Sequence, residues 1–465
     1  MSKAENLPRS LVTLSAALRE RRLSPVELVA TLLEHIESVE KRLNAFITVL
    51  PEKALEAAAR VEKEIQSGQY RGSLHGVPVG LKDLIYTAGI RTTMGSAFFE
   101  DYVPDYSATC VSKLEEAGAI IIGKTNTHEF AYGPTGDRSY FGPTRNPYDP
   151  ARIPGGSSGG SGAAVAAGLC YAALGSDTAA SVRVPAALCG VVGMKPSFGR
   201  VSKSGVFPLA WTLDHVGPLT RTVEDNALLL NALAGYDARD PYAAKRSTED
   251  FTRELQRPVR DGSVGVPVNH YFEHVEGEVE GRVREATEVF RSLGAEVREV
   301  ELPHLPQALK AQRIVLAAEA YAIHEERLES EPGKFGEEVR ERIRDGENLK
   351  AYRYARAQQV TRRRSLEEFG HALGEVDVLL TPTVPIAATE IGQREVEING
   401  HSEHVFSVLT RLTGPTNLNG LPSLSVPCGF TSSALPIGLQ LIGRPFDEAT
   451  LYRYAHAYEA EVKRL

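Results

Sequence analysis

The chain has 465 residues, of which 42% are apolar and 24% are charged, as in an ordinary globular protein. Its formal net charge of −8, without any basic tail or stripe, argues against nonspecific binding to nucleic acid. The N-terminus lacks the apolar segment of a secretory signal, and the longest weakly polar stretch, 163–175, is too short to span a membrane. Four widely spaced cysteines without a CxxC pair suit a reducing compartment, so we expect a cytoplasmic protein.

Residues 1–70 are predicted to be helical. Ser24, Pro25 and Glu27 form a capping box with proline at the first helical position. Apolar residues then recur at helical spacing, which predicts a buried stripe. Pro51 begins a second helix that is rich in alanine and glutamate.

From residue 76 the sequence pattern changes, and it predicts short apolar strands, glycine turns and compact helices. Residues 76–81 and 119–123 are predicted to be buried strands, with a helix ending just before the second of them. This alternation of strand and helix predicts an α/β fold.

The C-terminal half continues with a strand–helix–strand unit, whose strands are predicted at 263–268 and 294–303. The charged residues 325–369 have helical periodicity and are expected to form solvated helical faces. Two further core strands are predicted at 376–385 and 423–430.

A lysine and two serines lie in glycine- and alanine-rich segments of this chain. Lys82 lies in GVPVGLKDLI, Ser157 in IPGGSSGGSGAAVAAG, and Ser181 in GSDTAASVRVPAALCG. A serine hydroxyl needs a neighbouring base to become a nucleophile, and a neutral lysine can serve as that base. The apolar neighbours of Lys82 would lower its pKa by burial. The alternative is a structural lysine that is paired with Asp83 or lies at the end of a strand.

In this order, the three segments resemble the amidase signature family of serine hydrolases. The resemblance covers nearly the whole chain and implies an α/β protein with a central mixed β-sheet covered by helices on both sides. We expect a single domain over 1–465, and its parts are a signature core at about 76–221, an N-terminal helical segment at 1–70 and a peripheral helix-rich region at about 238–375.

The resemblance also assigns catalytic roles. Ser181 matches the nucleophile that forms an acyl-enzyme, and Ser157 matches the bridging serine that relays the proton to Lys82. In relatives the bridging serine follows a cis peptide bond, which is implied here between Gly156 and Ser157. The expected reaction is hydrolysis of a carboxamide to a carboxylate and ammonia or an amine, without a metal or organic cofactor.

Backbone N–H groups of the turn that leads into the nucleophile would form the oxyanion hole, and these belong to Thr178, Ala179, Ala180 and Ser181. The family commonly has two glycines where this chain has Ala179 and Ala180. Alanine disfavours positive φ, so the turn would be strained if it needed such a backbone. We favour a turn that does not need it.

Other positions of the family pattern predict supporting residues. Asp177 and Arg183 are expected to brace the nucleophile turn, and Ser158 is expected to cap a helix rather than to catalyse. The substrate pocket is expected to draw on residues 413–421 and on a second segment, which consists of Tyr132, Gly133, Pro134, Thr135 and Gly136.

Three other motifs compete with this interpretation. Residues 118–125 satisfy the Walker A pattern, but three isoleucines there predict a strand whose amides belong to a sheet. Residues 155–159 satisfy the GxSxG elbow, but a loop precedes them where an elbow needs a strand. Residues 270–274 satisfy the HxxEH zinc pattern, but they are expected in a loop without a third ligand.

The main rival within the family is the glutaminase subunit of a tRNA-dependent amidotransferase. That subgroup typically has an acidic residue where this chain has His128 in KTNTHEF, so we favour a free-standing amidase. The expected partners are a small-molecule amide and no nucleic acid or membrane, with a homodimer as the base-rate oligomer. A catalytically silent binding protein on the same scaffold is the alternative from another class.

Overall fold

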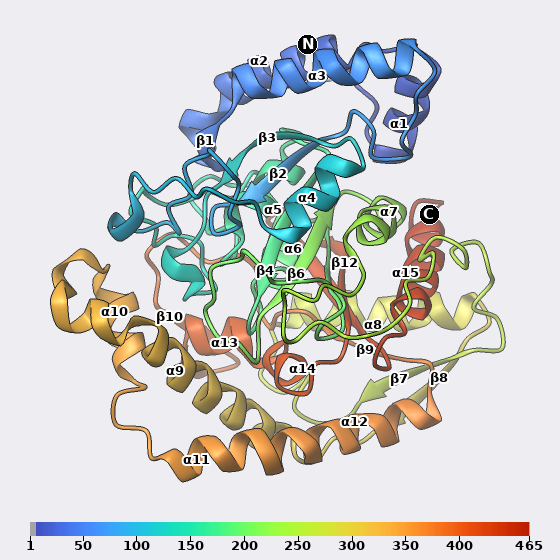
Figure 1. Cartoon of the computed structure of the whole chain (residues 1–465). Coiled ribbons are helices and arrows are strands. Elements are labelled where there is room, and N and C mark those ends of the chain that lie inside the picture. Colours follow the sequence, from blue (N-terminus) through green and yellow to red (C-terminus); the bar gives the residue numbers. More distant parts are fainter. Residues whose placement is uncertain (1–5, 465) are drawn as a thin grey trace.

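The computed structural model describes residues 6–464, and an eleven-stranded sheet runs through the centre of this part of the chain (Figure 1). The strands follow the spatial order β1-β3-β2-β4-β6-β5-β12-β13-β9-β7-β8. Their bounds are β1 (Phe46–Val49), β2 (Pro78–Lys82), β3 (Ile120–Thr125), β4 (Ala172–Asp177), β5 (Val192–Lys195), β6 (His215–Thr220), β7 (Ser263–Pro267), β8 (Glu296–Val300), β9 (Val378–Pro382), β12 (Ser423–Phe430) and β13 (Pro436–Ile442). A separate hairpin consists of β10 (Glu395–Ile398) and β11 (His401–His404).

The sheet is mixed, as expected. β2 is parallel to both β3 and β4, and β7 is parallel to both β8 and β9. The remaining pairs are antiparallel. The parallel strands β2, β3 and β4 are buried along their whole length, as strands covered on both faces must be.

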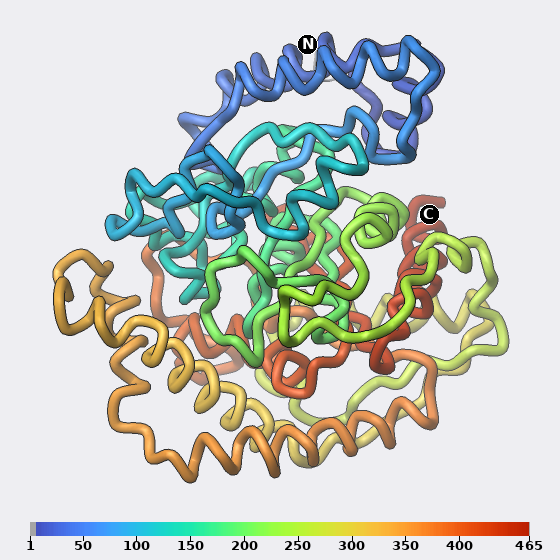
Figure 2. The backbone as a smooth tube through the Cα atoms, in the orientation of Figure 1, coloured from blue at the N-terminus to red at the C-terminus, as the bar shows by residue number. Residues whose placement is uncertain are grey.

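Helices surround the sheet, and two groups of them lie at opposite edges of the molecule. Figure 2 shows the N-terminal helices in blue at one edge and an arc of gold and orange helices at the other. The helices are α1 (Leu11–Arg19), α2 (Pro25–Leu43), α3 (Pro51–Gln66), α4 (Thr109–Glu116), α5 (Gly159–Ala166), α6 (Arg183–Cys189), α7 (Val223–Leu233), α8 (Gly277–Ser292), α9 (Leu305–Ser330), α10 (Glu337–Arg344), α11 (Ala351–Arg356), α12 (Arg362–Glu375), α13 (Val405–Arg411), α14 (Gly414–Asn419) and α15 (Glu448–Val462).

Most predicted elements are confirmed. Ser24 caps α2 by accepting hydrogen bonds from the backbone N–H groups of Val26 and Glu27. The predicted strand–helix–strand unit is β7, α8 and β8, with its two strands paired in parallel. The prediction that residues 1–70 are only helical is wrong, because β1 lies between α2 and α3 and pairs with β3.

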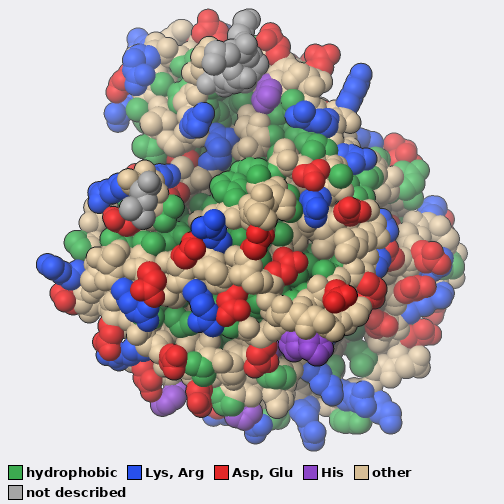
Figure 3. All heavy atoms as spheres, turned by 180° about the vertical axis from the view of Figure 1, so that it is seen from behind, with side chains coloured by type: hydrophobic (Ala, Val, Ile, Leu, Met, Phe, Trp, Pro, Cys, Tyr) green, Lys and Arg blue, Asp and Glu red, His purple; other side chains and the backbone are tan. Residues whose placement is uncertain are grey.

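The surface carries charges of both signs. Acidic and basic side chains are interspersed over most of the face in Figure 3. Within residues 6–464, no helix is both long and apolar enough to cross a membrane. The four cysteines are free thiols, and all of them are buried.

Candidate active site

Two neighbouring parallel strands bring the predicted catalytic segments together. Leu81 of β2 is in register with Leu174 of β4, so Lys82 lies beside the carboxyl end of β4. The turn that contains Ser181 follows β4 directly. The crevice at the carboxyl ends of such strands is where α/β sheets usually bind their ligands.

Lys82 is fully buried, and its contacts are hydroxyl groups. Its Nζ donates to Ser157 Oγ at 2.7 Å and to Ser176 Oγ at 2.9 Å. Burial lowers the pKa of Lys82 from 10.5 to about 7, while the negative charges of Asp177 and Asp214 act in the opposite direction. A large fraction of this lysine is therefore neutral near pH 7 and can accept a proton from Ser157.

Ser157 is held by a tightly packed backbone. A cis peptide bond joins Gly156 to Ser157, as the resemblance implied. The Ser157 carbonyl accepts a hydrogen bond from the His128 backbone N–H at 3.1 Å. A Cβ on Gly156 would lie 2.5 Å from the backbone nitrogen of Gly136, so only glycine fits at this position.

The nucleophile turn leaves its backbone N–H groups free. Among the described residues, none of the four amides from Thr178 to Ser181 donates to a protein acceptor. Neither Ala179 nor Ala180 is among the described residues with positive φ, so the two alanines do not strain the turn. The four amides are thus available to an oxyanion, and Ser181 is 6% exposed beside them.

Asp177 and Arg183 form a buried ion pair that holds this turn. Arg183 Nη2 and Nε donate to the two Asp177 carboxylate oxygens at 2.9 and 3.0 Å, and both side chains are fully buried. Asp177 Oδ2 also accepts from the Val182 backbone N–H at 3.1 Å. Burial alone would raise the pKa of Asp177, but the charge and hydrogen bonds of Arg183 outweigh it and lower that pKa.

The expectation that Ser158 caps a helix needs correction. Ser158 stands at the N-cap position of α5, but its hydroxyl makes no capping hydrogen bond. Instead, its Oγ donates to the Ser176 carbonyl at 3.2 Å and accepts from the Ser176 backbone N–H at 3.3 Å. The hydroxyl thereby joins the loop of the bridging serine to β4.

The two segments predicted to form the substrate pocket lie next to the loops of Ser157 and Ser181, and their role in a pocket stays a prediction. Residues 132–136 are buried, and Gly133 and Gly136 pack against Gly156. In 413–421, Thr413 and Asn417 accept hydrogen bonds from Arg183 at 3.0 and 2.6 Å. This second segment therefore supports the brace of the nucleophile turn.

Sequence reasoning missed three residues of the site. Ser176 accepts a hydrogen bond from Lys82. It stands in the same motif as Ser181, but only Ser181 was recognised there. Gln312 of α9 donates to the Thr178 carbonyl at 3.3 Å from 134 residues away. Asp214 accepts a hydrogen bond from Thr178 Oγ1 at 2.6 Å. Neither Gln312 nor Asp214 stands in a recognisable sequence motif.

The competing Walker A segment is a strand in the structure. Residues Ile120–Thr125 form the buried β3, whose backbone pairs with β1 and β2. Lys124 points its Nζ at the Ile85 carbonyl at 2.5 Å and at Thr92 Oγ1 at 2.7 Å. The segment is thus a structural part of the sheet.

A buried lysine that donates to two serine hydroxyls, close to a turn of free backbone amides, is the arrangement expected of a serine hydrolase with a lysine base. The family model described as Amidase matches residues 27–452. The chain therefore belongs to the amidase family, the amidase signature enzymes, and is a hydrolase that acts on amide C–N bonds.

Individual relatives match nearly the whole length of the chain. The chain is 42% identical, over 96% of each sequence, to a protein of Geobacter sp. (strain M21) that is named as one subunit of glutamyl-tRNA(Gln) amidotransferase. It is similar to a solved structure described as "An unexpected vestigial protein complex reveals the evolutionary origins of an s-triazine catabolic enzyme", with a TM-score of 0.93, 32% identity and coverage of 97% and 98%. A structure described as "Crystal structure of amidase" matches with a TM-score of 0.89 and 36% identity over 97% and 99% of the two chains.

These relatives correct the expectation about partners. We expected a small-molecule amide alone, no nucleic acid and a homodimer. That expectation is wrong, because the relatives at 40–43% identity are named as one subunit of an amidotransferase that is itself named for a tRNA. The absence of a basic stripe in the sequence does not exclude such a role, since the other subunits of an assembly can contact the nucleic acid.

Proposed function

We propose that the chain is the amide-hydrolysing subunit of a glutamyl-tRNA(Gln) amidotransferase and releases ammonia from glutamine for a partner protein. The observation that carries the proposal is the identity of 42% over 96% of each sequence to a protein named as part of that enzyme. These relatives favour this alternative over the free-standing amidase. A cytoplasmic location belongs to the proposal, and the free, buried cysteines support it.

The geometry supports a two-step mechanism. Ser181 Oγ attacks the amide carbonyl carbon while its proton passes through Ser157 to neutral Lys82. The amides of the nucleophile turn bind the resulting oxyanion. Lys82 returns the proton through Ser157 to the leaving nitrogen, the C–N bond breaks and the amine departs, leaving an ester on Ser181.

Hydrolysis of the ester uses the same relay, with water in the place of Ser181. A water molecule loses a proton to Ser157 and Lys82, and its oxygen bonds to the acyl carbon. The bond between that carbon and Ser181 Oγ then breaks, and the proton returns to Ser181. The products are a free carboxylate and a regenerated triad, and no metal or organic cofactor takes part in these steps.

The assignment of roles can be tested without knowing the substrate. The protein is treated with a serine-directed fluorophosphonate, its intact mass is measured and the modified peptide is mapped. We expect one adduct on Ser181 that the Lys82→Ala variant does not form. An adduct on Ser157 would reverse the roles of the two serines, and the absence of any adduct would favour a silent site.

The glutaminase role is tested by ammonia release. The chain is assayed with glutamine alone and then after co-expression with the other subunits of the same amidotransferase, with glutamyl-tRNA(Gln) present. We expect glutamine hydrolysis that rises in the complex. Hydrolysis of simple amides without any glutamine hydrolysis, alone or in the complex, would instead support a free-standing amidase.

A further inference from the structure

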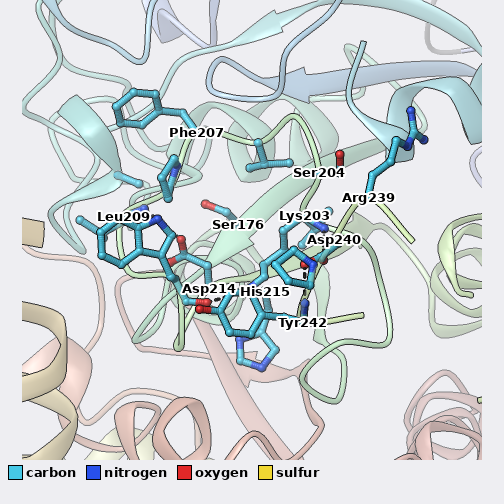
Figure 4. A pocket seen from close by; sticks show the side chains of 16 residues that line it. Ser176, Lys203, Ser204, Phe207, Leu209, Asp214, His215, Arg239, Asp240 and Tyr242 are labelled. Atoms are coloured by element: carbon cyan, nitrogen blue, oxygen red, sulfur yellow. Dashed lines mark hydrogen bonds between the residues drawn. The ribbon is translucent and has the colours of Figure 1, made fainter. Parts of the chain in front are cut away.

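Two cavities of the structure differ in whether their charged side chains have partners. Figure 4 shows the first, of about 180 Å³, whose lining side chains include Lys203 and Asp240. Lys203 Nζ donates to the Trp211 carbonyl at 2.7 Å. Asp240 accepts from the backbone N–H groups of Lys203 and Tyr242 at 2.8 and 2.9 Å. Because these charges already bind protein atoms, they are not free to bind a ligand.

The second cavity, of about 370 Å³, lies at the N-terminal end of α8, where Glu276, Gly277 and Glu278 line it. We call it the α8 pocket. Arg152 and Thr389 line it as well, and they come from segments that lie far from α8 in the sequence. Its charged groups, unlike those of the first cavity, keep unused hydrogen-bonding atoms.

The first turn of α8 leaves its backbone N–H groups without protein acceptors. Glu276 stands at the N-cap position, but its side chain makes no capping hydrogen bond. Within residues 6–464, no acceptor binds the N–H groups of Gly277, Glu278 and Val279. A Cβ on Gly277 would meet nothing within 4 Å, so a ligand atom can approach these amides. Free amides at the start of a helix favour an anion such as a carboxylate.

Arg152 and Glu276 line the same cavity without forming an ion pair with each other. Arg152 Nε donates to Asp149 Oδ2 at 3.2 Å and Nη1 to the Ala388 carbonyl at 2.6 Å, while Nη2 has no acceptor in the described part of the chain. Glu276 Oε2 accepts from the Ala387 backbone N–H at 2.9 Å, and no described residue donates to Oε1. Burial raises the pKa of Glu276, while the positive charge of Arg152 acts in the opposite direction. The α8 pocket thus presents one cationic and one anionic group.

A buried hydroxyl in the wall of the α8 pocket also lacks a partner. Thr389 is only 6% exposed, and its Oγ1 makes no hydrogen bond to any described residue. Buried polar atoms are normally hydrogen-bonded, because an unpaired one costs stability. A polar ligand in the pocket would supply the missing partner.

We propose that the α8 pocket binds a free α-amino acid with an aliphatic side chain. The ligand's carboxylate accepts hydrogen bonds from the α8 amides, Arg152 and Thr389, and its ammonium group binds Glu276. A ligand with a single charge would leave one of the pocket's charges unpaired. The apolar wall receives the side chain, and this wall consists of Ala387, Ala388, Val396 and Leu435. The inference is independent of the proposed function, because the triad takes no part in the binding.

The α8 pocket is joined to the loop that leads to the bridging serine. The Thr389 carbonyl accepts a hydrogen bond from the Ile153 backbone N–H at 2.9 Å. Ile153 follows Arg152 directly and lies four residues before Ser157. A ligand that binds Arg152 and Thr389 should therefore oppose local opening of residues 151–157.

Isothermal titration calorimetry of the full chain with L-leucine tests the site. We expect one leucine per chain with a Kd below about 1 mM. 4-Methylpentanoate lacks the ammonium group and isopentylamine lacks the carboxylate, so each should bind about tenfold or more weakly than leucine. Equal binding of either analogue would overturn the proposal, and so would the absence of saturable leucine binding up to about 10 mM.

Two variants test the location of the ligand. Gly277→Leu places a side chain beside the free amides and should raise the Kd for leucine about tenfold or more. Gly281→Leu, one turn further along α8, is its matched control, because a Cβ there also meets nothing within 4 Å, and it should keep the Kd. Glu276→Gln should also raise the Kd about tenfold, and it serves if Gly277→Leu does not fold. A Kd that neither Gly277→Leu nor Glu276→Gln changes would overturn the assignment.

Hydrogen exchange tests the contact with the serine loop. Saturating leucine should slow amide exchange in residues 151–157 of the wild-type chain, and the same leucine concentration should have a smaller effect in Gly277→Leu. Unchanged exchange in the presence of bound leucine would mean that the ligand does not touch this wall, and would overturn the proposal. Neither measurement depends on amide hydrolysis, so a failure here leaves the proposed function intact, and loss of the glutaminase role leaves the site intact.

Discussion

The pH dependence of hydrolysis is the most direct test of the proposed base. Lys82 has a pKa of about 7 because it is buried. This change from the ordinary lysine value corresponds to a free energy on the order of 5 kcal/mol. Only the neutral amine accepts a proton, so kcat/KM should rise with pH through a midpoint near 7 and then level off. One pH unit below the midpoint, it should be about tenfold below the plateau.

A variant of Asp214 tests whether the midpoint of the pH profile depends on the charges around Lys82. The negative charges of Asp177 and Asp214 keep the pKa of Lys82 higher than burial alone would. Asp214→Asn removes one of these charges, so the midpoint of the kcat/KM profile should move to lower pH. The assay is ammonia release across the pH range, with circular dichroism as the control for folding. A wild-type profile that keeps rising above a pH of about 9, as an ordinary lysine would cause, would refute the reasoning. So would an upward move of the midpoint in the variant.

Three further predictions concern residues that support the proposed catalytic groups. Asp177→Ala leaves the buried Arg183 guanidinium without its carboxylate partner. Urea denaturation should therefore show a loss of about 3–5 kcal/mol in unfolding free energy. A smaller loss would mean that water enters the space left by the Asp177 side chain. A Cβ on Gly133 would lie 2.2 Å from the His128 ring, so Gly133→Ala should displace the loop against Gly156 and lower kcat/KM by on the order of 10²-fold. Its control, Gly281→Ala on α8, meets nothing within 4 Å and should keep full activity. Ala180→Gly should lower the unfolding free energy by about 0.5–1 kcal/mol. It should not raise kcat/KM, because φ at Ala180 is already acceptable to alanine. A variant with a higher kcat/KM would show that the turn needs glycine.

The sequence was sufficient for the elements with strong local patterns. The cap at Ser24, the buried strands β2 and β3 and the strand–helix–strand unit of β7, α8 and β8 all follow from periodicity and capping chemistry. β1 escaped prediction because its four residues gain their hydrogen bonds from β3, which lies far along the chain. Short strands of this kind depend on tertiary pairing more than on their own residues.

The same distinction holds for the site. Lys82 and the two serines stand in recognisable motifs, whereas their supports come from distant segments. Gln312 reaches the Thr178 carbonyl from α9, and Asn417 reaches the Asp177–Arg183 pair from α14. These contacts exist only once α9 and α14 pack against the nucleophile turn, so no local pattern could indicate them.

Burial alone does not distinguish the proposed base Lys82, because three lysines within residues 6–464 are fully buried. Burial also lowers the pKa of Lys124, to about 8, and lowers that of Lys195. Lys195 Nζ donates to the Leu421 carbonyl, and a carbonyl oxygen has no proton to give to an amine. Lys124 Nζ does contact hydroxyl groups, those of Thr87 and Thr92, as well as the Ile85 carbonyl. Lys82 differs in where its partner lies, because Ser157 precedes Ser158, whose backbone N–H donates to the Ser181 carbonyl at 3.2 Å. The position of the hydroxyl partner beside the turn of Ser181, more than the pKa, therefore favours Lys82 as the proposed base.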